Sequence, residues 1–331
     1  MTEPETSQSG VRHVVVGADQ ADRRLDNFLG TQLGRIPKPV VYRLIRTGQV
    51  RVNGGRAKAD TRLAAGDRIR LPPVRLEPTE GPPVISQTQR EAFEAAVLLE
   101  EDRFIVLDKP SGLAVHAGSG IRIGLVDIAR AARPGAARID LVHRLDRETS
   151  GCLILAKDAR TLRELNAGLA AHRFRKCYTA LLAGTLQRKQ IKVDAPMDVG
   201  HRQNSERHAI VSDEGIAAVT TFSVLHAYAQ WTLVQAEPAT GRTHQIRVHA
   251  RHLGCPLAGD DRYGDDAANE AARALGLRRL FLHASRLEFE LGGRRISVRA
   301  ELPGDLNEML ARLEPAFEAQ VINQNESTDT R

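Results

Sequence analysis

Cysteine and aromatic residues are scarce in this sequence. Its 331 residues include 3 cysteines and 1 tryptophan, and aromatic residues make up only 4% of the chain. Cys152, Cys177 and Cys255 lie far apart and form no Cys-x-x-Cys pair. That spacing argues against both a disulfide framework and a thiolate zinc site. We therefore expect a protein of a reducing compartment.

Long apolar runs and nucleotide-binding motifs are also missing. No stretch approaches the roughly 18 apolar residues that a membrane-spanning helix needs. The opening residues, MTEPETSQSG, lack the apolar segment of a secretion signal. No GxxxxGK[ST] motif occurs, and GSGIRIG at 118–124 has the wrong spacing for a dinucleotide loop. We expect a cytoplasmic protein that binds no membrane and uses no cofactor.

Four histidines, His143, His244, His249 and His252, raise the possibility of a metal site. Residues 244 and 249 would lie about 140° apart around an ideal helix, so their rings would not converge. No nearby Glu or Cys completes a ligand set. We therefore predict no metal.

Positive charge is concentrated at one end of the chain. The composition, 42% hydrophobic and 27% charged, is that of an ordinary globular protein, and the net charge is +6. Residues 11–74 hold 13 Arg and Lys against 5 Asp and Glu, a local +8 that leaves −2 for the remainder. Such a basic module suits a phosphate backbone, although a solvated positive face is the alternative.

Composition also predicts the domain organisation. The run PPVRLEPTEGPPVISQTQR has five prolines and no apolar periodicity, which is typical of a semi-extended linker. Polar termini without periodicity predict disorder. The expected order is a disordered tail at 1–10, a small basic domain at 11–74, a linker at 75–90, a larger domain at 91–315 and a second disordered tail at 316–331.

The basic segment has the pattern of a small helical domain with a hairpin. Apolar spacing predicts helices over 25–33 and 38–47, and QVRVNGGRAK reads as strand, Asn-Gly turn and strand. DRIRL alternates as a further strand. RLDNFL, PKPVVYRLIRTGQVRVNGGRAK and LAAGDRIRLPP together resemble the S4-type RNA-binding domain. The resemblance implies phosphate contacts from the second helix and the hairpin, made by Lys38, Arg43, Arg46, Arg51, Arg56 and Lys58.

The larger segment mixes strands with fewer helices. Alternating residues predict a strand at 176–183 with Tyr178 on one face, two strands lie within 220–237, and Asp158 can cap a helix that runs to about 172. A helix is expected at 242–253. The pattern favours the α+β class, with a mixed, largely antiparallel sheet in the catalytic domain.

One acidic residue stands between two arginines in the stretch LVHRLDRETSG. Asp146 lies in an expected loop before the apolar strand CLILA. If the side chains of Arg144 and Arg147 converge on it, its charged form is favoured, as a nucleophile requires. A solvated loop ion-pair cluster is the alternative, which spacing alone does not exclude.

Three ordered motifs carry a family resemblance over about residues 23–310. HRLDRETSG, KCYTALLAG and GRTHQIRVH resemble the large-subunit ribosomal RNA pseudouridine synthases of the RluA type, and the S4-like module points to the RluC-like branch. The resemblance implies isomerisation of specific uridines to pseudouridine in 23S ribosomal RNA without a cofactor. The N1–C1′ bond breaks, the uracil rotates, and C5 bonds to C1′.

The resemblance also implies roles for individual residues. Asp146 matches the catalytic aspartate, which either attacks C1′ or removes a 2′ proton. Tyr178 matches the tyrosine that stacks on the target base and can assist removal of the C5 proton, with a core position as the alternative. Arg247 matches the arginine that pairs with the aspartate, and Arg242 is its nearby substitute. Arg144 resembles the side chain that fills the space of the everted uridine, with a surface salt bridge as the alternative.

Two other functions remain open at this level. One is a non-enzymatic, ribosome-associated S4-domain RNA-binding protein, and the other is a glycosidase acting on free nucleosides, for which no second carboxylate is evident. We expect RNA, as large-subunit ribosomal RNA or a pre-ribosomal particle, to be the partner of a monomeric enzyme. Which uridines are modified depends on RNA shape and loop contacts.

Overall fold

The structure is a computed structural model that describes residues 10–17, 20–33, 36, 38–73, 84–117, 123–198, 200, 202–203 and 206–314. The side chains of residues 38, 39, 202, 203, 206 and 207 are not part of this description. The chain divides into two compact units, Met1–Pro82 and Pro83–Arg331. The tails predicted to be disordered fall outside the described residues, apart from Gly10.

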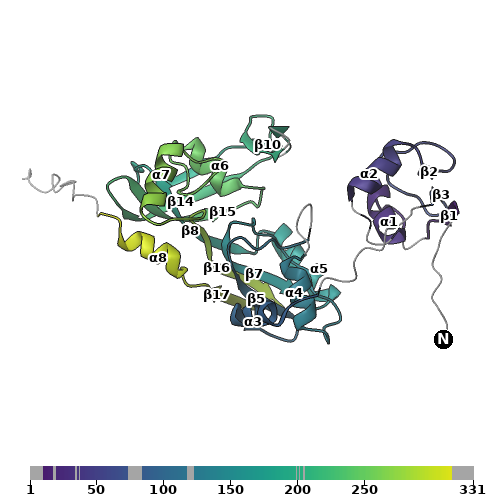
Figure 1. The fold of residues 1–331 in the computed structure, drawn as a ribbon, viewed down its shortest axis with the longest axis horizontal. Helices are drawn as coiled ribbons and strands as arrows, with labels where there is room; N and C mark the ends of the chain where they lie inside the picture. The colour runs from purple at the N-terminus through teal and green to yellow at the C-terminus, as the bar shows by residue number, and fades with distance from the viewer. Residues whose placement is uncertain are drawn as a thin grey trace, which may run out of the picture. The chain divides into compact units, whose positions relative to one another are not determined.

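The first unit packs two helices against a three-stranded sheet, drawn in purple in Figure 1. Its elements are β1 (Arg12–Val15), α1 (Leu25–Gln32), α2 (Lys38–Arg46), β2 (Arg51–Val52) and β3 (Arg68–Leu71). The strand order is β1-β3-β2, with both pairings antiparallel. Leu25, Phe28, Val41, Leu44 and Ile69 share one buried core. The apolar spacing that predicted the two helices is therefore confirmed.

The predicted hairpin in this unit is wrong in its second strand. Asn53 and Gly54 form the expected turn, both with positive φ (51° and 81°), as a tight hairpin turn requires. The returning chain, however, makes only an isolated bridge between Val52 and Gly55. β2 pairs instead with β3, where Val52 faces Ile69. A strand distant in sequence thus replaces the local partner.

The second unit is built on a ten-stranded mixed sheet (Figure 1). The strands on its main path run in the order β4-β5-β7-β16-β8-β15-β14-β9, while β6 pairs with β7 and β17 with β16. These strands are β4 (Val97–Glu100), β5 (Phe104–Lys109), β6 (Asp140–Leu141), β7 (Ser150–Ala156), β8 (Arg175–Ala183), β9 (Gln190–Asp194), β14 (Val219–Ala227), β15 (Trp231–Pro238), β16 (Leu282–Leu291) and β17 (Arg294–Arg299). Among the pairings within this sheet only β7 with β16 is parallel, so the predicted α+β fold with a largely antiparallel sheet is confirmed.

Helices and short strands cover this sheet. They are α3 (Gln87–Ala95), α4 (Leu125–Ala132), α5 (Ala159–Ala170), α6 (Gln245–His252), α7 (Asp266–Ala274), α8 (Gly304–Ala311), β10 (Met197–Asp198), β11 (Arg202–Gln203), β12 (Glu206–Arg207) and β13 (Ile210–Val211). Alternate residues of each central strand enter different cores, as the two-residue period of a strand requires. Leu153 of β7 packs in the core that includes α4 and α6, whereas Ile154 packs in the core that includes α5.

β16 lies between β7 and β8 in the sheet, and its backbone passes very close to the start of β7. Gly151 has a φ of +107°, and a Cβ atom there would lie 2.4 Å from the carbonyl oxygen of Ala284. Only glycine fits this position without displacement of the backbone. The close approach fixes the point at which the chain leaves the loop containing Asp146 and enters the sheet.

Two predicted boundaries are wrong. The linker was predicted to reach residue 90, but α3 begins at Gln87 because Ser86 and Gln89 form a reciprocal capping box. The helix predicted over 242–253 begins three residues later, at Gln245, because His244 has a left-handed backbone (φ 57°). Ile246 and Ala250 of this helix face the core.

Candidate active site

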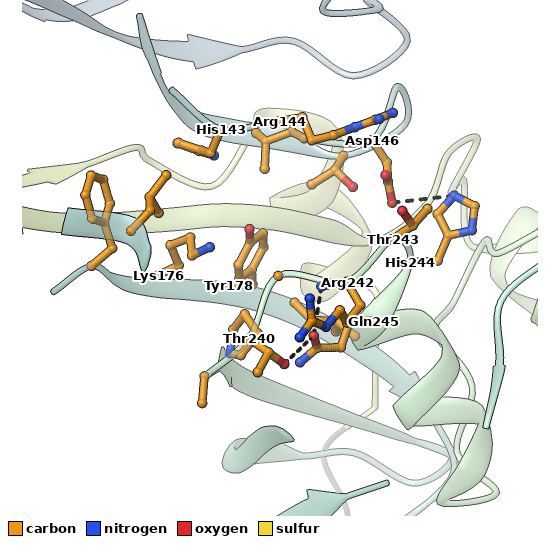
Figure 2. A pocket seen from close by; sticks show the side chains of 18 of the residues that line it. His143, Arg144, Asp146, Lys176, Tyr178, Thr240, Arg242, Thr243, His244 and Gln245 are labelled. Carbon is orange, nitrogen blue, oxygen red and sulfur yellow. Dashed lines mark hydrogen bonds and ion pairs between the residues drawn. The ribbon is translucent and has the colours of Figure 1, made fainter. Parts of the chain in front are cut away.

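A pocket of about 480 Å³ opens over the centre of the sheet. It brings together the five residues predicted for catalysis and substrate binding, namely Asp146, Tyr178, Arg144, Arg242 and Arg247. Arg144 and Asp146 come from the loop before β7, Tyr178 from β8 and Arg242 from the segment that leads into α6 (Figure 2), while Arg247 lies in α6 itself. Leu282 of the intervening strand β16 also lines the pocket.

A buried lysine fixes the loop that carries Asp146. Lys109, at the end of β5, is fully buried, and its Nζ donates to the carbonyl oxygens of Pro110, Leu113 and Arg147 at 2.8–3.0 Å. Burial lowers the pKa of Lys109 to about 7, although three carbonyl acceptors match the three donors of an ammonium group. The sequence analysis did not identify this role of Lys109.

The arginines that flank Asp146 in sequence do not pair with it. Arg147 Nε donates to the carbonyl oxygen of Gly112 at 3.0 Å and lies 3.5 Å from Glu148 Oε1. Arg144 is exposed, and no described carboxylate lies within ion-pair distance of it. The two guanidinium groups therefore do not converge on Asp146, so the condition under which they would favour its charged form is not met.

The cationic partner of Asp146 comes from α6 instead. Arg247 Nη1 lies 4.0 Å from Asp146 Oδ2, at the limit of an ion pair. Its shorter contacts go to Asp260, with Nε at 2.8 Å from Oδ2 and Nη2 at 2.6 Å from Oδ1. Burial by itself would lower the pKa of Arg247, but the hydrogen bonds and charge of Asp260 raise it overall. Arg247 therefore stays charged, with Asp260 as its main partner.

Asp260 is a buried carboxylate that sequence reasoning did not assign to the site. It is 1% exposed and also accepts hydrogen bonds from the backbone N–H groups of Arg262 and Tyr263. Burial favours its neutral form, yet the Arg247 contacts and these N–H groups hold its pKa below the ordinary value. Asp260 is the first aspartate of the stretch GDDRYG at 259–264, and only the fold shows that it orients Arg247.

Tyr178 points from β8 toward the loop that carries Arg144 and Asp146 (Figure 2). It is 8% exposed, and no described residue hydrogen-bonds to its hydroxyl. Burial, with a contribution from the Asp146 charge, raises the pKa of Tyr178 above its ordinary value. It packs with Ala180 and Leu182 on the predicted face of the strand, while its ring also lines the pocket.

Arg242 lies at the pocket wall rather than beside Asp146. Its backbone N–H donates to Gln245 Oε1 at 3.0 Å, and its Nε donates to the carbonyl oxygen of Ala217 at 3.2 Å. Gln245 in turn accepts from the hydroxyl of Thr240. These contacts close the turn before α6 (Figure 2), and Arg247 is the arginine of this motif that faces Asp146.

Two further basic residues of the pocket were not predicted. Lys176, two residues before Tyr178 on β8, lines the pocket, and burial lowers its pKa. Among the described residues no acidic group lies within ion-pair distance of it. His143 also lines the pocket, and its buried Nε2 has no described hydrogen-bond partner. Strand alternation could have predicted that Lys176 lies on the same face of β8 as Tyr178. It could not have predicted that Lys176 has no acidic partner among the described residues.

The predicted RNA-contact residues of the first unit lie on α2 and on the segment around β2. Arg43, Arg46, Arg56 and Lys58 are exposed. Arg51 is half-buried, and its Nε donates to the carbonyl oxygen of Gly48 at 3.0 Å. Lys38 begins α2, but its side chain is outside the described part of the structure.

Metal-binding clusters and membrane-spanning helices are both absent from the described residues. Within the described ranges no group of three or more His, Cys, Asp and Glu could hold a metal ion. His249, one of the histidines considered for a metal, contacts Thr220 Oγ1 and the carbonyl oxygen of Ala195 through its two ring nitrogens. None of the described helices has the length and apolar character needed to cross a membrane.

Comparison with known proteins decides the family. Residues 103–252 match the family model described as RNA pseudouridylate synthase, and residues 23–69 match the S4 domain. Ribosomal large subunit pseudouridine synthase C of Escherichia coli (strain K12) is 45% identical over 304 residues, which cover 91% of this chain and 95% of that protein. The chain belongs to the RNA pseudouridylate synthase family. The same-named protein of Haemophilus ducreyi is 42% identical and is covered over 99% of its length.

Solved structures agree with this membership. Human RNA Pseudouridylate Synthase Domain Containing 4 superposes with a TM-score of 0.58 at 25% identity, over 70% of this chain and 98% of that one. Human RNA Pseudouridylate Synthase Domain Containing 1 gives 0.56 at 24% identity, over 66% and 88%, and shares the fold. The pocket described above therefore lies in the sheet of a pseudouridine synthase.

Proposed function

We propose that this enzyme isomerises uridines of large-subunit (23S) ribosomal RNA to pseudouridine, with Asp146 as its catalytic residue. The observation that carries the proposal is the meeting of Asp146, Tyr178 and Arg247 in one pocket of the family's fold. The near-full-length similarity to ribosomal large subunit pseudouridine synthase C supports the choice of RNA.

The reaction rearranges one nucleotide without net gain or loss of atoms. The C1′–N1 bond of uridine breaks, a C1′–C5 bond forms, and the proton on C5 is replaced by one on N1. Asp146 assists by attack on C1′ or by removal of the 2′ proton, and both routes need an ionised carboxylate at the ribose. Its side chain is 22% exposed, so it can reach a substrate while it remains beside Arg247.

Tyr178 suits the role of a platform for the uracil. Its raised pKa keeps the phenol neutral at physiological pH, and a neutral phenol has no negative charge with which to take the C5 proton. An aromatic face in a pocket stacks on a base with a gain of about 1–3 kcal/mol. We therefore assign stacking, rather than base catalysis, to Tyr178.

The remaining basic residues suit the RNA backbone. Arg144 is exposed at the pocket mouth, where it can occupy the space left by an everted uridine. Arg242 and Lys176 line the same pocket and can neutralise phosphates near the target. The exposed arginines of α2 would anchor structured RNA, which supplies affinity and position rather than sequence choice.

The rival function is a non-enzymatic S4-domain RNA-binding protein. The test is Asp146→Asn, with Asp213→Asn as a matched control at an exposed turn outside the pocket. We expect Asp146→Asn to bind ribosomal RNA as the wild type does but to give no carbodiimide primer stops. The control should form pseudouridine at the wild-type rate. Normal activity of Asp146→Asn would remove Asp146 from the mechanism.

We further propose that the enzyme acts as a monomer in the cytoplasm, on ribosomal RNA before or during subunit assembly. Three free, buried cysteines fit a reducing compartment. Light scattering of the purified protein at micromolar concentration would give its mass directly. A dimer mass would remove the monomer from the proposal without affecting the chemistry.

A further inference from the structure

His244 has a strained backbone at the entrance to α6. Its φ and ψ are 57° and 19°, in the left-handed region, and its side chain makes no capping hydrogen bond to the helix. This conformation costs a residue with a side chain about 1 kcal/mol or more. Such strain persists where surrounding contacts fix the residue in place, often at functional sites.

The contact that fixes His244 is a hydrogen bond to a buried tyrosine. Its Nδ1 lies 2.7 Å from the hydroxyl oxygen of Tyr263, which also accepts a hydrogen bond from the backbone N–H of Ala209 at 3.0 Å. The tyrosine hydroxyl has one hydrogen to donate, and His244 Nδ1 is the described acceptor beside it. The phenol therefore donates to Nδ1, and the ring proton of a neutral His244 lies on Nε2.

The other side of the ring faces Asp146. His244 Nε2 lies 3.8 Å from Asp146 Oδ2 (Figure 2). Arg247 Nη1 lies 4.0 Å from the same oxygen. Among the described residues no donor contacts Oδ1. The two oxygens of Asp146 are thus in different surroundings.

Burial, and to a lesser extent the charges of Arg247 and Arg262, lower the pKa of His244 to about 4, against the opposing effect of Asp146. The ring is therefore neutral at physiological pH. A neutral N–H group can orient a carboxylate without transferring a proton to it, whereas an imidazolium could protonate the nucleophile. The surroundings of His244 thus suit a neutral donor.

We propose that His244 is a positioning residue whose Nε2–H, fixed by Tyr263, holds Oδ2 of Asp146 together with Arg247 and leaves Oδ1 for the ribose. This inference rests on the proposed function, because it assumes that Asp146 reacts. The 3.8 Å contact is about 1 Å longer than a hydrogen bond, and catalytic hydrogen bonds often tighten only when substrate is bound.

The first test determines the tautomer of the His244 ring in the absence of RNA. We would assign the ring signals of His244 in ¹⁵N-labelled full-length protein by their loss in His244→Gln. We expect the Nε2–H tautomer in the wild type and a mixture of both tautomers in Tyr263→Phe. A wild-type ring protonated on Nδ1 would overturn the proposal.

The second test distinguishes the contributions of the two ring nitrogens of His244 to the reaction rate. In His244→Asn the side-chain amide lies where Nδ1 was, and asparagine tolerates the left-handed backbone. In His244→Gln the longer side chain brings its amide to the position of Nε2. We expect the single-turnover rate on ribosomal RNA to fall about 10- to 100-fold in His244→Asn, with unchanged RNA affinity. His244→Gln should stay within a few-fold of the wild type. Equal rates in the two variants, whether both normal or both low, would contradict the proposal.

The two proposals fail in different ways. If wild-type protein forms no pseudouridine on ribosomal RNA, the proposed function fails, while the tautomer measurement still reports on His244. If the wild type is active and Asp146→Asn is not, but His244→Asn turns over normally, the proposed function stands and the role of His244 is withdrawn.

Discussion

Arg247 binds both carboxylate oxygens of Asp260 in a buried, two-point ion pair, with contacts of 2.8 and 2.6 Å. The Arg247 guanidinium also lies over the ring of Tyr263, 4.9 Å from its centre. These contacts leave Nη1 as the nitrogen that faces Asp146. The guanidinium is thereby held with Nη1 toward the carboxylate of Asp146.

Replacing Arg247 by Lys should separate charge from geometry. An ammonium keeps the positive charge but cannot contact Asp260 at two points and face Asp146 at the same time. We expect the rate of pseudouridine formation to fall about 100-fold, as for a misplacement of roughly 1 Å. RNA affinity should be unchanged in a filter-binding assay. Wild-type turnover by Arg247→Lys would mean that charge alone is sufficient.

Asp260→Asn should instead destabilise the protein, because it leaves the Arg247 charge buried without its partner. Removal of one member of a buried ion pair costs about 3–5 kcal/mol. Urea unfolding at pH 7 would measure the loss, with Asp261→Asn as the neighbouring control, because Asp261 is exposed. A free energy of unfolding equal to that of the control would show that Asp260 is dispensable for stability.

Lys176→Met should weaken RNA binding without weakening the fold. A charge-assisted hydrogen bond to phosphate contributes about 1.5–3 kcal/mol, so we expect RNA affinity to fall roughly 10-fold, since 1.4 kcal/mol is a factor of ten. The melting temperature should stay constant or rise, because burial already disfavours the charge of Lys176. Lys192→Met, at an exposed position outside the pocket, is the control. Loss of stability with intact RNA affinity would make Lys176 a structural residue.

The double variant Arg43→Gln, Arg46→Gln should change the salt dependence of RNA binding. Each phosphate contact contributes about one unit to the slope of log affinity against log salt concentration, so the slope should fall by roughly 2. Arg62→Gln is the control, because Arg62 lies in the same unit and its side chain pairs with Asp22 at 3.6 Å. An unchanged slope in the double variant would remove α2 from the RNA interface.

Glu100 should make stability depend on pH in the acid range. Its hydrogen bonds to Arg133, and then to Lys157, lower its pKa from 4.5 to about 2 despite partial burial. The stabilisation is therefore complete above pH 4.5 and is lost as the pH falls from 4.5 to 2. After allowance for solvent exposure we expect about 1–2 kcal/mol. Urea unfolding of Glu100→Gln should match the wild type at pH 2 and be less stable at pH 7. A constant difference across this range would contradict the assignment.

Local patterns in the sequence predicted local structure well. Alternation placed Tyr178 on the pocket face of its strand, and Asp158 caps α5 through the backbone N–H of Thr161 as expected. The capping box of Ser86 was equally local but was overlooked within a proline-rich run. Periodicity and capping depend on residues a few positions apart, which is why the sequence suffices for them.

The polar contacts of the site depended on the fold. Asp146 meets His244 and Arg247, about one hundred residues away, only because the loop before β7 and the turn before α6 lie over the same strands. Arg144 and Arg147 are its sequence neighbours, yet the loop directs them elsewhere. The buried ion pair of Arg247 with Asp260, and the lack of an acidic partner for Lys176 among the described residues, likewise follow from the fold.

The single strand between β7 and β8 has a consequence for the width of the reactive cleft. Strands in a sheet are spaced about 4.8 Å apart, so the strand leading from the aspartate and the strand bearing the phenol stand roughly 10 Å apart. Main-chain hydrogen bonds, together with the tight contact at Gly151, maintain that clearance. β16 fills the space between these two strands and forms the floor of the pocket at Leu282, so the lateral separation of the aspartate loop from the phenol is set by the backbone.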